Sequence, residues 1–206
     1  MDNIKLNFIN RSNDINNSEI VIFQKNVAEN FDEMVVAWKV IKNCGRNDNH
    51  PFTYTMEIQV SASDSYGNYS PKLTAYNGNA FEMIKDTSGD VLRLSSTSAT
   101  NANEVEIINK LTVGAINANC YRDGSLVAIK TNLAPEQKAF FEFQPTIFIG
   151  VVSQVDEGEV LNSAIVSEIN TKFNLLGITS ADIVMTGGGA GRSATPFSFT
   201  LENINK

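Results

Sequence analysis

Apolar and polar residues alternate over the stretch FTYTMEIQVSA, which begins at Phe52 and ends at Ala62. Residues two positions apart lie on the same face of a β-strand, so this alternation gives an extended segment one apolar and one polar face. The stretch therefore predicts a half-buried strand. Other strand-like runs are IKLNFIN from Ile4, EIVIFQKNV from Glu19 and PFSFTLENI from Pro196, and AFFEFQPTIFIGVV from Ala139 is two apolar runs on either side of Pro145.

Turn-forming residues separate these runs at the intervals expected of an all-β protein. The motifs DSYGNYSP, YNGN, TSGD and YRDGSL are rich in Gly, Asn, Asp and Ser. The pair Asp123-Gly124 predicts a two-residue hairpin turn, and the polar stretch 95–104 predicts a long loop. We therefore expect residues 1–206 to form a single all-β domain, an antiparallel β-sandwich of about nine to eleven strands with at most one short helix.

Two segments, 25–41 and 163–177, fit both a helix and a strand. In the second segment Ile165, Ile169 and Phe173 have helical spacing, yet residues 168–175 also alternate between polar and apolar. Because the rest of the chain reads as β-structure, we expect both segments to be strands, with a helix as the alternative in each.

Charge and composition favour some partners over others. The chain has 206 residues, 42% of them hydrophobic, and a net charge of −7. An acidic chain without a Lys/Arg-rich segment is not expected to bind nucleic acid. No signal peptide is recognisable, and no apolar run reaches the roughly 18 residues of a membrane span. We expect a cytoplasmic protein without a transmembrane segment, and leave open its export by a route that needs no signal peptide.

Residues that carry catalysis or bind metals are sparse. Cys44 and Cys120 are too few for a disulfide framework, and whether they pair is left open. The one histidine, His50, precedes a proline in a turn-like stretch and has no nucleophile motif beside it. The densest acidic stretch, QVDEGEV at residues 154–160, fits an exposed turn better than a pair of catalytic carboxylates. We therefore assign no catalytic residue, no cofactor and no metal ligand.

The stretch TGGGAGRSA from Thr186 is nearly a phosphate-binding loop. Such loops bind phosphate through the amides at the start of a following helix. Here Pro196 and an alternating, strand-like run follow instead, so we expect a sharply turned connection between two strands. Gly187, Gly188 and Gly189 stay candidates for lining a recognition surface.

Tyrosines in turn-like contexts are the other candidates for a ligand surface. Tyr66 and Tyr69 lie in DSYGNYSP and Tyr76 in AYNGN, whereas Trp38 lies in an apolar run and is expected in the core. Aromatic rings presented on loops are typical of proteins that bind sugars or lipid head groups.

These observations favour a non-enzymatic protein that acts through its surface. We expect self-association into a structural assembly, because open sheet edges can serve as contacts between copies. The alternative is a lectin-like or lipid-head-group-binding module, including the soluble form of a pore-forming toxin whose inserting hairpin would lie at 92–108. A small hydrolase with scattered carboxylates ranks last.

Overall fold

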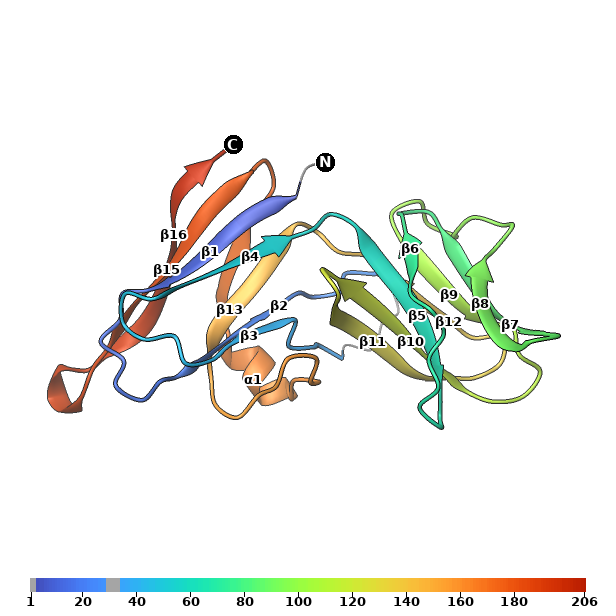
Figure 1. Ribbon diagram of the computed structural model, residues 1–206, viewed down its shortest axis with the longest axis horizontal. Coiled ribbons are helices and arrows are strands. Elements are labelled where there is room, and N and C mark those ends of the chain that lie inside the picture. Colours follow the sequence, from blue (N-terminus) through green and yellow to red (C-terminus); the bar gives the residue numbers. More distant parts are fainter. Residues whose placement is uncertain (1–2, 29–33) are drawn as a thin grey trace. The chain divides into compact units, whose positions relative to one another are not determined.

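The computed structural model describes residues 3–28 and 34–206. Within them the chain forms sixteen β-strands, one α-helix and one 3-10 helix (Figure 1). Two compact units are formed: unit 1 is Met1–Gln24, Ala37–Met56 and Pro145–Lys206, and unit 2 is Lys25–Val36 and Glu57–Gln144. The all-β prediction is confirmed. The single antiparallel sandwich of nine to eleven strands is not, because sixteen strands are divided among four sheets. That residues 1–206 form one domain stays a prediction.

Unit 1 contains two four-stranded sheets with the orders β16-β15-β1-β4 and β14-β13-β2-β3. Trp38, just before β3, is fully buried and lies edge-on to Phe52 and Tyr54 of β4, with ring centroids 6.0 and 5.8 Å away, so the two sheets share a core. The strands are β1 (Ile4–Asn10), β2 (Glu19–Phe23), β3 (Lys39–Ile41), β4 (Asn49–Tyr54), β13 (Thr146–Val152), β14 (Thr171–Asn174), β15 (Ser180–Gly188) and β16 (Thr195–Asn205).

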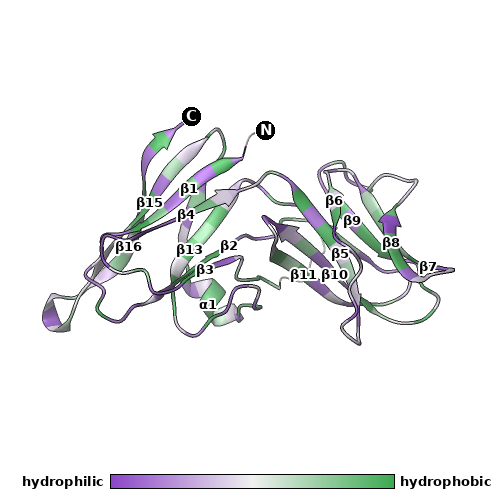
Figure 2. Ribbon diagram, in the orientation of Figure 1, coloured by the Kyte–Doolittle hydropathy of each residue, from purple (hydrophilic) through white to green (hydrophobic). Residues whose placement is uncertain are grey.

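Unit 2 also contains two four-stranded sheets, with the orders β11-β10-β5-β6 and β12-β9-β7-β8. Its core includes Val60, Phe81, Ile107, Cys120 and Phe141, all at most 2% exposed. Apolar and hydrophilic residues alternate along β5, and along β1 of unit 1 (Figure 2). The strands are β5 (Ile58–Asp64), β6 (Leu73–Ala75), β7 (Ala80–Asp86), β8 (Gly89–Leu94), β9 (Val105–Asn109), β10 (Ile116–Arg122), β11 (Ser125–Leu133) and β12 (Lys138–Phe141).

Two strand pairs are parallel, which corrects the purely antiparallel prediction. β1 runs parallel to β15 in unit 1, and β7 runs parallel to β9 in unit 2. The first pair joins the start of the chain to its end, with Leu6 opposite Ala181. Alternation marks each of these segments as a strand, but it carries no information on the direction of the partner.

The alternating stretch from Phe52 to Ala62 is not one strand. β4 ends at Tyr54, whose partner on β1 is Ile4, and β5 begins at Ile58, whose partner on β10 is Arg122. The three residues between them belong to neither strand, and the chain leaves unit 1 there. The alternation predicts the extended backbone correctly, but it continues across a boundary that only the strand partners define.

The two ambiguous segments have mixed outcomes. In 163–177 the strand prediction is wrong for the first half, which forms α1 (Ser163–Glu168), and correct for β14. The Asn162 side chain caps α1 by accepting a hydrogen bond from the Ile165 amide at 2.9 Å. In 25–41, Val35 forms an isolated bridge and 39–41 form β3, while 29–33 lie outside the described residues.

Predictions from turn chemistry are confirmed at two places. Asp123 and Gly124 connect β10 to β11 with φ values of 51° and 77°, the left-handed conformation that such two-residue turns require. Residues 95–104 form the loop between β8 and β9. Neither helix in the described part of the chain is long and apolar enough to cross a membrane.

Candidate functional site

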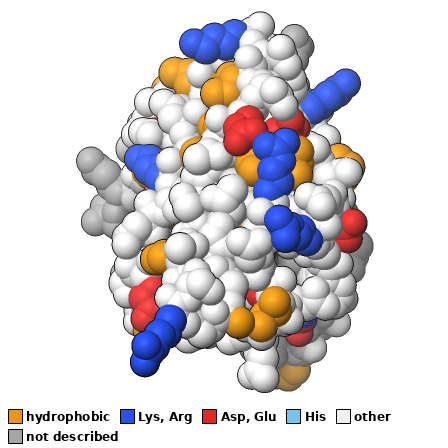
Figure 3. All heavy atoms as spheres, turned by 90° about the vertical axis from the view of Figure 1, so that its left-hand side faces the viewer, with side chains coloured by type: hydrophobic (Ala, Val, Ile, Leu, Met, Phe, Trp, Pro, Cys, Tyr) orange, Lys and Arg blue, Asp and Glu red, His pale blue; other side chains and the backbone are white. Residues whose placement is uncertain are grey.

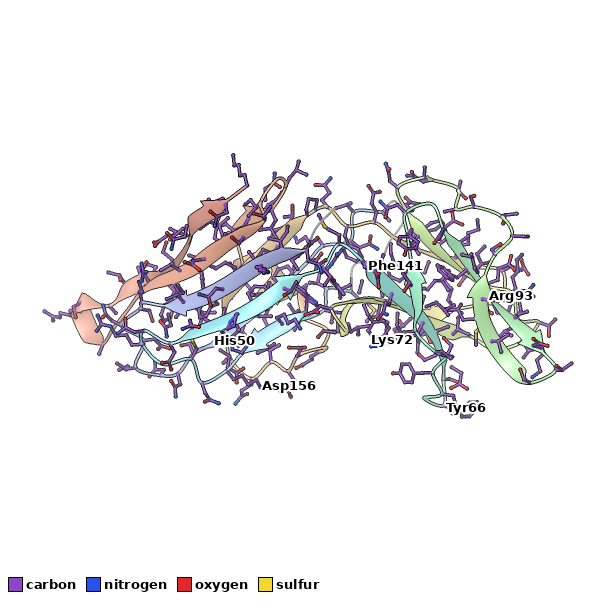
Figure 4. The ribbon with its side chains drawn as sticks, turned by 45° about the horizontal axis from the view of Figure 1, so that its top comes forward. His50, Tyr66, Lys72, Arg93, Phe141 and Asp156 are labelled. Atoms are coloured by element: carbon purple, nitrogen blue, oxygen red, sulfur yellow. The ribbon has the colours of Figure 1, made fainter. Side chains whose placement is uncertain are left out.

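The three candidate tyrosines all belong to unit 2 and all are exposed. Tyr66 and Tyr69, on the loop between β5 and β6, are 89% and 66% exposed, and Tyr76, in the turn between β6 and β7, is 64% exposed. Figure 4 shows Tyr66 at the tip of its loop. The structure brings Tyr66 and Tyr69 to the same groove and leaves Tyr76 outside it.

This groove, called here the tyrosine groove, has a volume of about 540 Å³. Three segments of unit 2 line it: the β5–β6 loop from Asp64 to Ser70, the β7–β8 hairpin, and the β9–β10 loop with the start of β10. Its charged lining residues are Asp64, Lys85 and Asp90. Lys85 and Asp90 form an ion pair with an N–O distance of 3.3 Å, so the groove carries nearly balanced charge.

The Asp64 carboxylate organises the loop that presents the tyrosines. One oxygen accepts hydrogen bonds from the backbone amides of Tyr66 and Asn68, both at 2.9 Å, and the other accepts one from the Asn68 side chain at 2.8 Å. The Asn68 hydrogen bonds are the main reason why the pKa of Asp64 is lowered. At the base of the loop, the Ser70 amide donates to the Ala62 carbonyl at 2.8 Å. These hydrogen bonds within the loop and at its base support the turn that carries both tyrosines.

Lys85, Asp90 and Val113 are lining residues that the sequence does not single out. They come from the β7–β8 hairpin and the β9–β10 loop, which only the sheet pairing of unit 2 brings beside the β5–β6 loop. For Val113 the sequence offers one signal, because an apolar residue directly before a glycine in a short turn can be exposed. In the structure Val113 is 82% exposed.

Gly187 and Gly188 are the last two residues of β15 in unit 1, Gly189 follows the strand, and all three have positive φ. A Cβ atom on Gly187 would collide with the Pro196 carbonyl oxygen, and one on Gly188 would lie 2.7 Å from the Phe197 ring. A three-residue 3-10 helix, Gly191–Ser193, follows, and then β16. The prediction of a turned connection between two strands is confirmed, and Gly187 and Gly188 have a packing role in it. Their role in recognition stays a prediction.

β16 is an edge strand with unusual length and little charge. It has eleven residues, none of them fully buried, and Glu202 is its one charged residue. Phe197 and Phe199, both half-buried, line a groove of about 860 Å³ in unit 1, together with residues of α1, β13 and the segment 16–19.

Figure 3 shows one face of the molecule, on which Lys and Arg side chains are scattered.

The remaining candidate groups for chemistry are the single histidine and the two cysteines. His50 lies in β4 opposite Phe8, not in a turn as expected, because β4 extends through Pro51 at the edge of its sheet. Cys44 and Cys120 are free thiols, which settles the open question of their pairing. Among the residues that the structure describes, no three His, Cys, Asp or Glu side chains lie close enough to hold a metal ion.

The acidic stretch at 154–160 forms ion pairs at the surface of unit 1. Lys42 binds Asp156 at 2.6 Å and Glu19 at 3.5 Å, and Lys39 lies 3.8 Å from Glu157. The hydrogen bond from Lys42 to Asp156 is the main cause of the raised pKa of Lys42. These carboxylates pair with lysines, which agrees with the expected exposed turn.

Comparison with known proteins finds no relative. No family model matches the sequence, and neither a curated protein nor a solved structure is significantly similar to it.

Proposed function

We propose that this protein is non-enzymatic and self-associates, and that two copies meet along the outer edge of β16. The observation that carries the proposal is the character of that edge: eleven residues with a single charge and no fully buried residue. The backbone N–H and C=O groups on the open side of an edge strand can pair with a strand of another chain.

Other edge strands of the four sheets are less suited to such pairing. β3, β6, β12 and β14 have three or four residues each, and β4 contains Pro51. β8 carries Asp90 and Arg93 in six residues. The nine-residue β11 already forms a bridge to Val35 through Ala128. Short length, proline and charge are the usual means by which proteins block edge-to-edge pairing. β16 also contains a proline, Pro196, but it is the second of eleven residues, and one charge follows it in the strand.

The sequence of β16 fits pairing with a second copy of itself. In a two-fold antiparallel pair centred on Phe199, Phe197 of each copy lies opposite Leu201 of the other. Glu202 then lies opposite Pro196, so like charges do not meet. Phe197 and Phe199 are half-buried beside the unit 1 groove. When a second copy covers this side, more of their apolar surface is removed from water, which favours association.

The test is light scattering coupled to size-exclusion chromatography over a wide range of protein concentrations. We expect a dimer or larger species for the natural sequence and a monomer for the double variant Ser198→Lys/Thr200→Lys, which places charge on the exposed face of β16. The matched control is Thr87→Lys/Ser88→Lys, in the exposed β7–β8 turn, which should associate as the natural protein does. A strict monomer at every concentration would exclude the proposal.

Two further expectations belong to this proposal. We infer that the β-sandwich is the architecture of each unit rather than of the whole chain, which the shared core around Trp38 supports for unit 1. A cytoplasmic location is proposed from the sequence alone.

The second candidate function, a lectin-like binding module, is favoured by the tyrosine groove.

A further inference from the structure

The border of the tyrosine groove exposes apolar side chains that the fold does not use. Tyr66, Tyr69 and Val113 are 89%, 66% and 82% exposed, and all three line the groove. Exposed apolar side chains are unremarkable when scattered singly, but a group of them around a concavity is typical of a binding surface. The groove volume of about 540 Å³ lies within the range of small-ligand sites.

The rings are presented by a loop that is already ordered. Asp64 accepts three hydrogen bonds from Tyr66 and Asn68, and the Asp64 amide donates to the Asn68 carbonyl at 3.0 Å. Ser63 and Tyr69 form a β-bridge at its base. A loop held in this way loses little conformational freedom when a ligand binds. The free energy gained from contacts with its aromatic rings is therefore offset only slightly by the entropy cost of ordering the loop.

The charges of the groove favour an uncharged ligand. Its ionisable lining groups are two carboxylates and one ammonium, and Lys85 is paired with Asp90. The Asp64 oxygens are occupied by the loop itself. An anion would find one lysine that already has a partner. A cation would find two carboxylates, of which Asp90 is paired with Lys85 and Asp64 accepts hydrogen bonds from the loop.

We propose that the tyrosine groove binds neutral carbohydrate. A sugar ring has an apolar face of C–H groups, which packs on an aromatic ring, and a rim of hydroxyl groups, which need donors and acceptors. Tyr66 and Tyr69 supply the rings, and Ser65, Asn68 and the Lys85–Asp90 pair supply polar groups in the same groove. This site lies on unit 2 and shares no residue with β16, so it does not depend on the proposed self-association.

The test uses native electrophoresis through gels that contain a soluble neutral polysaccharide (galactomannan, β-glucan or xylan in separate gels), backed by a glycan array. We expect at least one of these probes to retard the natural protein. Tyr66→Ala and Tyr69→Ala should each weaken binding about tenfold, the loss of one ring contact of ordinary strength. Tyr66→Trp, which keeps a ring at the tip, should retain binding.

Tyr76→Ala is the matched control, because Tyr76 is also an exposed tyrosine of unit 2 but lies outside the groove. It should bind as the natural protein does, and far-UV circular dichroism should show that every variant is folded. The proposal is overturned if no neutral glycan binds on gel or array, or if Tyr76→Ala weakens binding as much as Tyr66→Ala. It is equally overturned if Tyr66→Ala abolishes binding to phosphatidylcholine vesicles while glycan binding is unaffected.

Discussion

At the scale of single residues, the two cysteines have different surroundings. Cys120 is fully buried in β10, and burial raises the pKa of its thiol from 9.0 to about 12. Cys44 is half-buried, and its pKa is raised by burial first and then by the nearby charge of Asp48. Only the thiolate reacts with alkylating agents, so a raised pKa slows the reaction.

We therefore expect iodoacetamide to modify Cys44 in the folded protein and to leave Cys120 unmodified. The rate at Cys44 should be low at neutral pH and should increase as the pH rises toward its elevated pKa, because the thiolate fraction grows. Peptide mass spectrometry after timed labelling measures both sites, and labelling in urea serves as the control in which both cysteines react. Modification of Cys120 at the rate of Cys44 in the folded state would contradict this prediction.

Local context predicts the exposure of single aromatic residues well. Trp38 in an apolar run is buried, and the tyrosines in Gly/Asn-rich turns are exposed. Local context does not indicate which exposed residues share a site. Tyr66 and Tyr76 are equivalent in the sequence, yet only Tyr66 has Lys85 and Val113 across a groove, because strand pairing brings those segments together.

At the scale of elements, the β15–β16 hairpin depends on glycines where two backbone segments approach closely. Gly187 has a φ of 87°, and a Cβ there would collide with the Pro196 carbonyl oxygen. We expect Gly187→Ala to lower the free energy of unfolding by about 2–4 kcal/mol, through left-handed strain and crowding together. Gly124→Ala is the control, since its φ is 77° and an added Cβ meets nothing within 4 Å.

The control isolates the conformational part of the effect. Gly124→Ala should cost only about 1 kcal/mol, the strain of a side chain in left-handed backbone. Urea denaturation measures both values, with an unchanged dependence on urea concentration showing that the change is one of stability. If the two variants lose equal stability, crowding at Gly187 has no effect and the packing role assigned to it is wrong.

Elements are predictable from the sequence where local chemistry decides them. The Asp123-Gly124 hairpin is such a case, because its turn needs residues that accept positive φ. The division between β4 and β5 is not, since the alternation continues through Met56 while the strand partners change. At 163–177 the Asn162 cap favours a helix that the alternation conceals, and the chain becomes extended again at Ile169.

At the scale of the whole molecule, neither unit is one continuous piece of chain. The chain passes between units after Gln24, Val36, Met56 and Gln144. One sheet of unit 1 joins β1, β4, β15 and β16, which come from three separate segments. The three segments of unit 1 are joined to one another through the residues of unit 2. When unit 2 is folded, it holds the ends of those unit 1 segments closer together than an unfolded chain would. Ordering unit 2 thus lowers the chain entropy lost in forming unit 1.

We therefore expect the 206 residues to unfold in one cooperative transition, as the single-domain prediction requires. The single tryptophan, Trp38, reports the core of unit 1, while far-UV circular dichroism reports strands of both units. Phe141→Ala removes a fully buried ring from unit 2 and should cost about 3–5 kcal/mol. If the protein unfolds in a single transition, Phe141→Ala must lower the urea midpoint measured by Trp38 fluorescence as much as the midpoint measured by circular dichroism. A variant whose dichroism changes at lower urea while Trp38 fluorescence keeps its natural midpoint would show two independently folding domains.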